Sequence, residues 1–200
     1  MIDINDIQVA VVDGRGPVYE LAQWLRDIPD PWYVSRMGDF PDDRAWWVTG
    51  NAKNAAAAKF LAESDKRFLV LIDDDMVPSA ETRETMICEA PIASARHWGR
   101  WGGVVHNHPD GVVGMGFVKI RRDVLEAVGP NPFTVEAERE CECMAFCRKA
   151  KAAGFLPLHV GACGHQVPVV VSLNDKGGAA IRAPKKPTPG ATGPCPPGTP

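Results

Sequence analysis

The sequence lacks any long apolar stretch, because no run approaches 18 consecutive apolar residues. A helix that spans a membrane needs about 20 predominantly apolar residues, so we expect no such span. The first residues, Met-Ile-Asp-Ile-Asn-Asp, are acidic and do not resemble the cationic and then apolar start of a secretory signal. We therefore expect a cytoplasmic protein whose six cysteines are reduced thiols.

The sequence also lacks an excess of basic residues, with 22 Lys and Arg against 25 Asp and Glu. Four of these cations lie after residue 175, so residues 1–175 hold 18 basic residues against all 25 acidic ones. Non-specific nucleic-acid binding depends on a basic surface. This charge balance predicts that nucleic acid is not a partner.

Proline and glycine are concentrated near the end of the chain. Residues 176–200 hold seven prolines, five glycines and no acidic residue, which is typical of a disordered segment. The whole chain is 45% hydrophobic and 24% charged, as in ordinary globular domains. We expect one folded domain over residues 1–175 and a disordered tail over 176–200.

Short apolar runs alternate with helical patterns along the expected domain. Strands are predicted at 8–13, 32–35, 46–49, 68–72, 92–95, 116–120 and 156–160. Helices are predicted at 17–28, 51–64, 80–90, 122–128 and 136–153. This alternation indicates an α/β fold, a Rossmann-like single domain with a mostly parallel central sheet flanked by helices.

Three consecutive aspartates, Asp73, Asp74 and Asp75, follow the most apolar of these runs. Ligands of open α/β sheets bind outside the carboxyl ends of the strands. Since side chains alternate along a strand, Asp73 and Asp75 should share a face, where two carboxylates suit Mg²⁺ or Mn²⁺. The same residues could instead form a solvated acidic turn before the next helix.

The order of motifs along the chain resembles that of family 2 glycosyltransferases, which have the GT-A fold. The resemblance is carried by Asn51-Ala-Lys-Asn54, the Asp-x-Asp motif of residues 73–75, Gly114-Met-Gly-Phe-Val-Lys-Ile-Arg-Arg, Glu142-Cys-Met-Ala-Phe-Cys and Gly164-His165. It implies an enzyme that transfers a sugar from a nucleotide-diphosphate sugar, such as a UDP- or GDP-sugar, to an acceptor hydroxyl.

The resemblance also implies where the donor would bind. Mn²⁺ or Mg²⁺ would be held by Asp75 and His165, with Asp73 on the metal, its water shell or the donor ribose. The remaining residues implied to lie around the nucleotide and its phosphates are Asp13, Arg15, Lys53, Asn54 and Asp74. Lys53 could equally be a solvated helix residue, and Asn54 could cap its helix.

On the acceptor side, the implied residues are Trp98, Trp101, Met115 and Gly116. The two tryptophans lie in a glycine-rich sequence, expected to be a loop, where flat aromatic faces could pack on sugar rings. They could also simply anchor that loop in the core.

The position of the family's general base holds a cysteine in this chain. Inverting members have Asp directly after the Glu of their Glu-Asp motif, whereas this chain has Cys143. A thiol with a pKa of about 8.5 is a poor substitute for a carboxylate. We therefore expect Glu142 to act as the base of an inverting reaction, with Glu140 as the second nearby carboxylate. A retaining reaction, which does not require this base, stays open.

Three other interpretations remain. Cys141, Cys143 and Cys147 could form a structural zinc site with Cys163 and His165, although residues two apart on a helix point about 200° apart. A non-catalytic sugar- or nucleotide-binding module would be compatible with Cys143. A metal-dependent nucleotidyltransferase would usually have a fuller glycine-rich phosphate loop than Gly14-Arg-Gly16.

Overall fold

A seven-stranded sheet with the order β2-β1-β3-β6-β5-β7-β4 forms the centre of the protein. The computed structural model describes residues 2–13, 16–35, 45–99, 111–136, 140–166, 170–173 and 179–182. The strands of the sheet are β1 (Ile7–Asp13), β2 (Trp32–Ser35), β3 (Phe68–Asp73), β4 (Met76–Pro78), β5 (Ile92–Gly99), β6 (Phe117–Arg121) and β7 (Leu158–His165). All but β4 and β6 run in one direction, which confirms the predicted α/β domain with a mostly parallel sheet.

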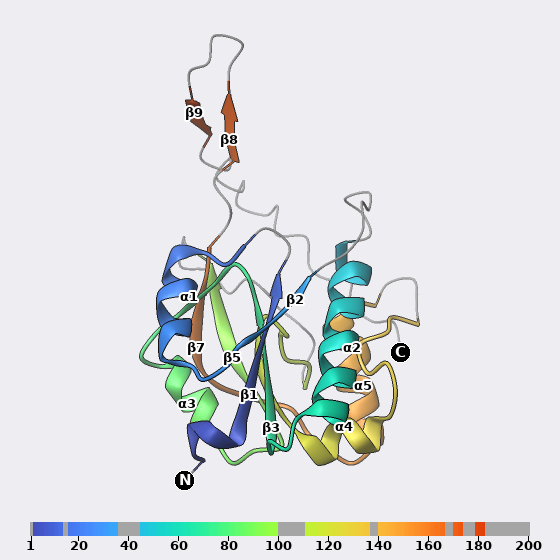
Figure 1. Ribbon diagram of the computed structural model, residues 1–200. Helices are drawn as coiled ribbons and strands as arrows, with labels where there is room; N and C mark the ends of the chain where they lie inside the picture. The colour runs from blue at the N-terminus through green and yellow to red at the C-terminus, as the bar shows by residue number, and fades with distance from the viewer. Residues whose placement is uncertain are drawn as a thin grey trace.

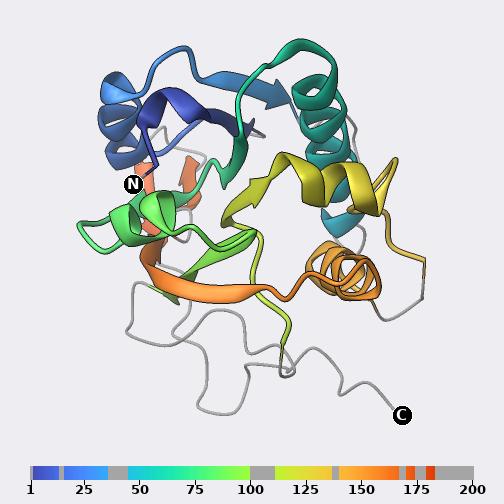
Figure 2. The ribbon, with the colours of Figure 1, turned by 90° about the horizontal axis from the view of Figure 1, so that it is seen from below.

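Helices cover both faces of the sheet (Figure 1). On one face lie α1 (Tyr19–Trp24), which continues into the 3-10 turn η2 (Leu25–Asp27), and α3 (Thr82–Ile87). On the other face lie α2 (Ala45–Glu63), α4 (Arg122–Val128) and α5 (Glu142–Ala152), which Figure 2 shows in teal, yellow and orange. A further 3-10 turn, η1 (Ile4–Asp6), precedes β1. None of the helices in the described part of the chain has the length and apolar character needed to cross a membrane.

Each face has its own apolar core. On the α1 and α3 side, Leu21 and Met86 pack with buried residues of the strands. On the α2, α4 and α5 side, Phe60, Leu125 and Phe146 do the same. Because both faces are covered, β3 is apolar at every position from Phe68 to Ile72, as expected for a strand buried on both sides.

The sheet is curled. Only Asp74 and Asp75 separate β3 from β4 in the sequence, yet three strands (β6, β5 and β7) lie between them in the sheet, which makes four strand spacings. In a flat sheet, four strand spacings would span roughly 19 Å. The three residue steps from Asp73 to Met76 can reach only about 11 Å. The far edge of the sheet, formed by β7 and β4, must therefore return toward the carboxyl end of β3.

The strand predicted at 46–49 is wrong, because these residues lie in the first turns of α2. A run as short as Trp-Trp-Val-Thr does not distinguish a strand from a buried helical turn. Gly50 contributes to the error, since a glycine is typical of the end of a strand, whereas this one lies inside α2. A Cβ atom at Gly50 would come within 2.8 Å of the Phe133 carbonyl oxygen, so this glycine allows the segment after α4 to pack against α2.

Other boundaries differ from those predicted. Helix α4 begins and ends where the sequence predicts, but α5 begins at Glu142 and not at residue 136. Strand β7 continues to His165, and β5 continues to Gly99, because the two strands pair along that length. Strand β4 was not predicted, since three residues ending in proline carry almost no strand pattern.

Strands β8 (Val170–Leu173) and β9 (Ala179–Arg182) pair with each other in a separate antiparallel sheet. Strand β9 lies within the segment 176–200, for which the composition predicts a disordered tail. The remainder of that segment lies outside the described residues, so the prediction of a tail stays a prediction.

Candidate active site

Polar residues gather where the parallel strands end. Asp13, Asp73 and His165 are the last residues of β1, β3 and β7, and these strands share a direction, so all three lie at one edge of the sheet. Val12 pairs with Asp73 in the register of β1 and β3. Lys53 of α2 and Glu142 of α5 reach the same region from the helices on one face.

The side chains of Asp75 and His165 meet at this edge. Nε2 of His165 lies 3.3 Å from Oδ2 of Asp75. The main chain holds both residues in place, because Met76 pairs with His165 in the sheet and the Gln166 N–H donates to the Asp75 carbonyl at 2.8 Å. The two side chains are 16% and 19% exposed, respectively, so solvent reaches both.

Asp75 and His165 fit a divalent cation. Two adjacent ligands of an octahedral ion, each bonded at about 2.1 Å, lie roughly 3 Å apart. The observed separation of 3.3 Å is close to that value. One carboxylate and one imidazole suit Mn²⁺ or Mg²⁺, and the imidazole favours Mn²⁺.

Lys53 bridges two carboxylates beneath the site. Its Nζ atom lies 3.2 Å from Oδ1 of Asp73 and 3.4 Å from Oε1 of Glu142, and its side chain is fully buried. Burial acts to lower the pKa of Lys53, but the charges of Asp73 and Glu142 outweigh burial and raise that pKa to about 12. Lys53 is therefore a buried cation that joins two candidate site residues, and it is not a solvated helix residue.

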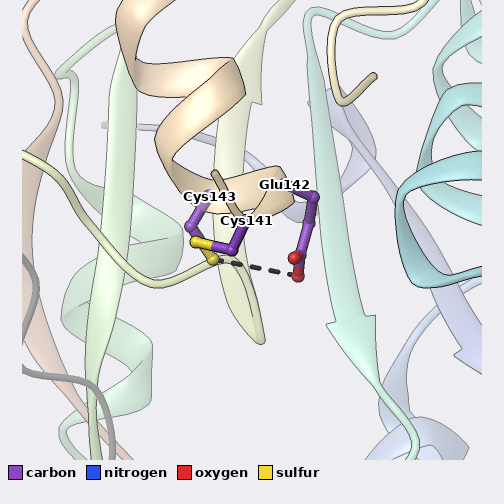
Figure 3. Close-up of side chains that lie close together, drawn as sticks. All are labelled: Cys141, Glu142 and Cys143. Carbon is purple, nitrogen blue, oxygen red and sulfur yellow. Dashed lines mark hydrogen bonds between the residues drawn. The ribbon is translucent and has the colours of Figure 1, made fainter. Parts of the chain in front are cut away.

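Glu142 occupies the first position of α5, between two cysteines (Figure 3). Its carboxylate is 12% exposed and also accepts a hydrogen bond from the Cys143 thiol, with 3.8 Å between Sγ and Oε1. Cys143 itself is buried on the core side of α5. The carboxylate thus stays within reach of solvent while the thiol packs inside, as the helical spacing predicts.

Asp74 differs from its two neighbours because it is only 1% exposed. Its N–H donates to the Val12 carbonyl at 3.2 Å, and its carbonyl accepts from the Val18 N–H at 2.8 Å. Asp74 therefore ties the end of β3 to β1 and to the start of α1.

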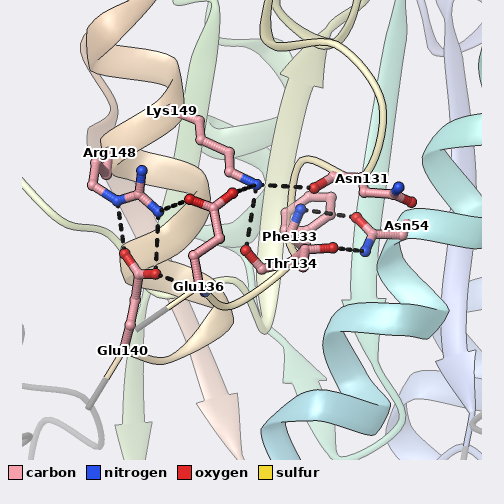
Figure 4. A network of polar contacts seen from close by, with 8 residues as sticks. All are labelled: Asn54, Asn131, Phe133, Thr134, Glu136, Glu140, Arg148 and Lys149. Carbon is pink, nitrogen blue, oxygen red and sulfur yellow. Dashed lines mark hydrogen bonds and ion pairs between the residues drawn. The ribbon is translucent and has the colours of Figure 1, made fainter. Parts of the chain in front are cut away.

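Glu140 lies in a different set of contacts from Glu142 (Figure 4). The Arg148 guanidinium donates to both of its carboxylate oxygens, at 2.9 and 3.2 Å, and also to Glu136 at 3.0 Å. Lys149 completes the network with an ion pair of 2.9 Å to Glu136. Glu140 is thus held by ion pairs on the outer side of α5.

Asn54, also drawn in Figure 4, lies in the middle of α2. Its Oδ1 accepts from the Phe133 N–H at 2.8 Å, and its Nδ2 donates to Oγ1 of Thr134 at 3.0 Å. Asn54 therefore secures the segment after α4 and does not cap its helix.

Residues expected beside the acceptor lie partly in the core. Met115 is fully buried in the apolar cluster of the α2 side. Gly116 accepts a 2.8 Å hydrogen bond from the Asp73 N–H, and a Cβ atom there would lie 2.9 Å from Cε1 of His97. The buried His97 in turn accepts from the Phe117 N–H. This glycine thus allows close packing directly behind the aspartates.

The prediction that Trp98 lies in a loop is wrong, because Trp98 belongs to β5 and pairs with Gly164 of β7. Arg15 and Trp101 lie outside the described residues. Asp13 is described only as the last residue of β1.

The prediction that Cys141 and Cys143 point apart is wrong. Cys141 has extended dihedral angles, φ −95° and ψ 167°, and precedes the helix. One ligand atom each from Cys141, Glu142 and Cys143 lie within 4.8 Å of one another. Cys147 does not join this group in the described part of the chain; its sulfur contacts the main chain of Val113.

No protein-family model matches the chain, and no curated protein is similar to it in sequence. Solved structures are similar in fold. The match to A197 from STIV has a TM-score of 0.51 and 12% identity, and it covers 89% of this chain and 94% of that one.

Two glycosyltransferases are also found. The Drosophila β1,4-galactosyltransferase 7, solved as a mutant with manganese, UDP-Gal and xylobiose, has a TM-score of 0.49 and 14% identity over 77% of this chain and 64% of that one. A glycosyltransferase involved in glycosylation of the major capsid of PBCV-1 has a TM-score of 0.36 and 12% identity over 60% and 62%. At these identities, the likeness that carries weight is that of the overall fold to A197 from STIV.

Proposed function

We propose that residues 1–175 form a metal-dependent glycosyltransferase that transfers a sugar from a nucleotide-diphosphate sugar to an acceptor hydroxyl, with inversion. UDP- and GDP-sugars are the proposed donors. The proposal rests above all on the Asp75–His165 pair, which lies at the carboxyl edge of a mostly parallel sheet. Ligand sites of α/β sheets lie at this edge.

Asp75 and His165 would hold the metal ion. When bound there, Mn²⁺ or Mg²⁺ would stabilise the negative charge that develops on the diphosphate leaving group. The negative charge of Asp73 is balanced by Lys53, whose Nζ atom lies 3.2 Å from Oδ1 of Asp73. Asp73 would also accept a hydrogen bond from the donor ribose or from water. The curl of the sheet places Asp75 and His165 together although 90 positions separate them in the sequence.

Glu142 would deprotonate the acceptor hydroxyl. A general base must lie within hydrogen-bonding reach of the proton that it takes. Its carboxylate is partly exposed beside Lys53, and Lys53 also contacts Asp73 of the donor side. This shared lysine would hold the base at a fixed distance from the donor.

A panel of UDP-, GDP- and dTDP-sugars in a thermal-shift assay, with and without Mn²⁺, tests the proposed function. We expect one nucleotide class to raise the melting temperature, and to do so only with the metal. Absence of a metal-dependent shift with every donor would contradict the proposal.

A binding module without transfer activity is the second candidate, since the position of the family's Asp base holds Cys143. It predicts metal-dependent donor binding by the wild-type protein with neither transfer nor donor hydrolysis. Chromatographic detection of free nucleotide diphosphate after incubation with donor and candidate acceptors distinguishes the two.

A further inference from the structure

Two cysteines flank the proposed base at a change of backbone conformation. Cys141 is extended and precedes α5, whereas Cys143 lies in its first turn. Their ligand atoms, together with one from Glu142, lie within 4.8 Å of one another. Two residues at this spacing inside a helix would point about 200° apart. The junction at Cys141 therefore creates a pair of neighbouring thiols that a continuous helix would separate.

The two thiols have different properties. The neighbouring thiol of Cys143 lowers the pKa of Cys141 to about 7, although burial opposes this change. The proximity of Cys141, together with burial, raises the pKa of Cys143 well above its ordinary value. Cys141 is therefore a partly exposed thiol whose lowered pKa favours the thiolate, and Cys143 is a buried thiol beside it. Thiol–disulfide exchange requires a thiolate that attacks and a second thiol close to it, and these two cysteines provide both.

We propose that Cys141 and Cys143 are a site of reversible disulfide formation that controls Glu142, with a low-molecular-weight disulfide such as oxidised glutathione as the reactant. The control of transfer rests on the proposed function, whereas formation of the disulfide does not.

The exchange balances without any further reactant. The Cys141 thiolate attacks one sulfur of the small disulfide, forms a mixed disulfide and releases one small thiolate. Cys143 then passes its proton to the Glu142 carboxylate, which its Sγ already contacts at 3.8 Å, and attacks Sγ of Cys141. The second small thiolate leaves and takes up the proton from Glu142, while the first takes up from solvent the proton that Cys141 had released. Two protein thiols are oxidised and one small disulfide is reduced to two thiol molecules.

Closure of the disulfide acts directly on the proposed base. Glu142 is the residue enclosed between the two cysteines, so drawing their sulfur atoms into a bond changes the main chain that carries its carboxylate. The 3.4 Å contact between Glu142 and Lys53 depends on that main chain. Asp75 lies in the turn between β3 and β4, and His165 ends β7, so oxidation should stop transfer while metal-dependent donor binding persists.

Zinc is the competing occupant of these three groups, and the local charge disfavours it. Nζ of Lys53 lies 3.4 Å from Oε1 of Glu142, and its pKa of about 12 keeps it cationic at neutral pH. A neighbouring cation repels a metal ion but stabilises a thiolate. In addition, the described part of the chain supplies three ligands here, whereas structural zinc takes four.

The test uses the full chain, incubated with mixtures of reduced and oxidised glutathione. We expect intact mass spectrometry to show the loss of two hydrogen atoms. Fragmentation of the tryptic peptide 140–148, which holds Cys141, Cys143 and Cys147, should place the bond between Cys141 and Cys143. Cys141→Ser, which puts a favourable residue at the helix N-cap, should abolish the bond without unfolding the protein. Cys88→Ser, the matched control on a partly buried thiol elsewhere, should leave it unchanged.

Failure of the folded protein to form this bond would overturn the proposal. So would zinc that remains after dialysis and protects both thiols from glutathione. If the bond forms and the oxidised protein transfers sugar at the reduced rate, control of Glu142 is overturned. If the reduced protein shows no metal-dependent donor binding, the proposed function fails, and the peptide map still decides whether the disulfide exists.

Discussion

Nζ of Lys53 lies 3.4 Å from Oε1 of Glu142, although 89 residues separate the two in the sequence. The same ammonium group lies 3.2 Å from Oδ1 of Asp73. One buried cation thus connects the acidic end of β3 with the start of α5. Stability and transfer should both depend on it.

Replacing Lys53 by Met should destabilise the protein by about 3–5 kcal/mol, because two largely buried carboxylates lose their shared cation. Urea denaturation measures the change. Lys59→Met is the control, since Lys59 forms an exposed pair with Glu63 at 3.9 Å and should cost about 1 kcal/mol or less. Equal stability of the two variants would show that the buried bridge contributes nothing.

Replacing Asp75 by Asn, or His165 by Ala, should remove the Mn²⁺-dependent part of donor binding, because each variant loses one of the two proposed metal ligands. Isothermal titration with the donor, at several Mn²⁺ concentrations, measures this loss. Asp123→Asn removes a surface carboxylate that pairs with Arg121 at 2.7 Å and should bind the donor as the wild type does. Unchanged metal dependence in both site variants would place the ion elsewhere.

Replacing Glu142 by Gln should keep donor binding and lower the transfer rate by about 100-fold or more, since general-base catalysis contributes at least that factor. Glu140→Gln disturbs ion pairs to Arg148 and should affect transfer much less. Steady-state transfer assays compare the two. Wild-type transfer by the Glu142→Gln variant would exclude this residue as the base.

Alkylation of Cys141 should depend on pH in a characteristic way. Its pKa of about 7 lies below that of an ordinary thiol, so the thiolate forms at lower pH, and the rate with iodoacetamide should rise through pH 7. In Cys143→Ala the neighbouring thiol that lowers this pKa is absent, and the midpoint should move upward. Rates followed by peptide mass spectrometry at residue 141 provide the measurement, and an identical midpoint in both proteins would contradict this account.

Replacing Gly50 by Ala should destabilise the protein by about 1–3 kcal/mol, because the new Cβ atom would lie 2.8 Å from the Phe133 carbonyl oxygen. Within an unobstructed helix the same change would stabilise by roughly 1 kcal/mol, so the sign of the effect is informative. Thermal denaturation measures it. A rise in melting temperature would show that the segment after α4 can move away at little cost.

Local patterns and motif order predict much of this structure. The apolar run of β3 and the three aspartates after it indicate Asp75, and Gly164-His165 indicates the residue that Asp75 contacts at the sheet edge. Contacts over long sequence separations have no local pattern. The partners of Lys53 lie 20 and 89 residues away, so nothing near Lys53 distinguishes it from a solvated helix residue. The extended conformation of Cys141 likewise depends on where α5 begins, and helix boundaries are the least predictable part of a pattern.

The two outer strands of the curled sheet, β2 and β4, differ in how readily each could pair with a strand of another chain. Strand β4 has three residues and ends at Pro78, whose nitrogen has no hydrogen to donate, so it offers little to a foreign strand. In the described part of the chain, β2 has no strand on its outer side, and its residue Tyr33 is 55% exposed. In concentrated solution, edge-to-edge contact between molecules should therefore begin at β2, and a lysine in place of Tyr33 should suppress it.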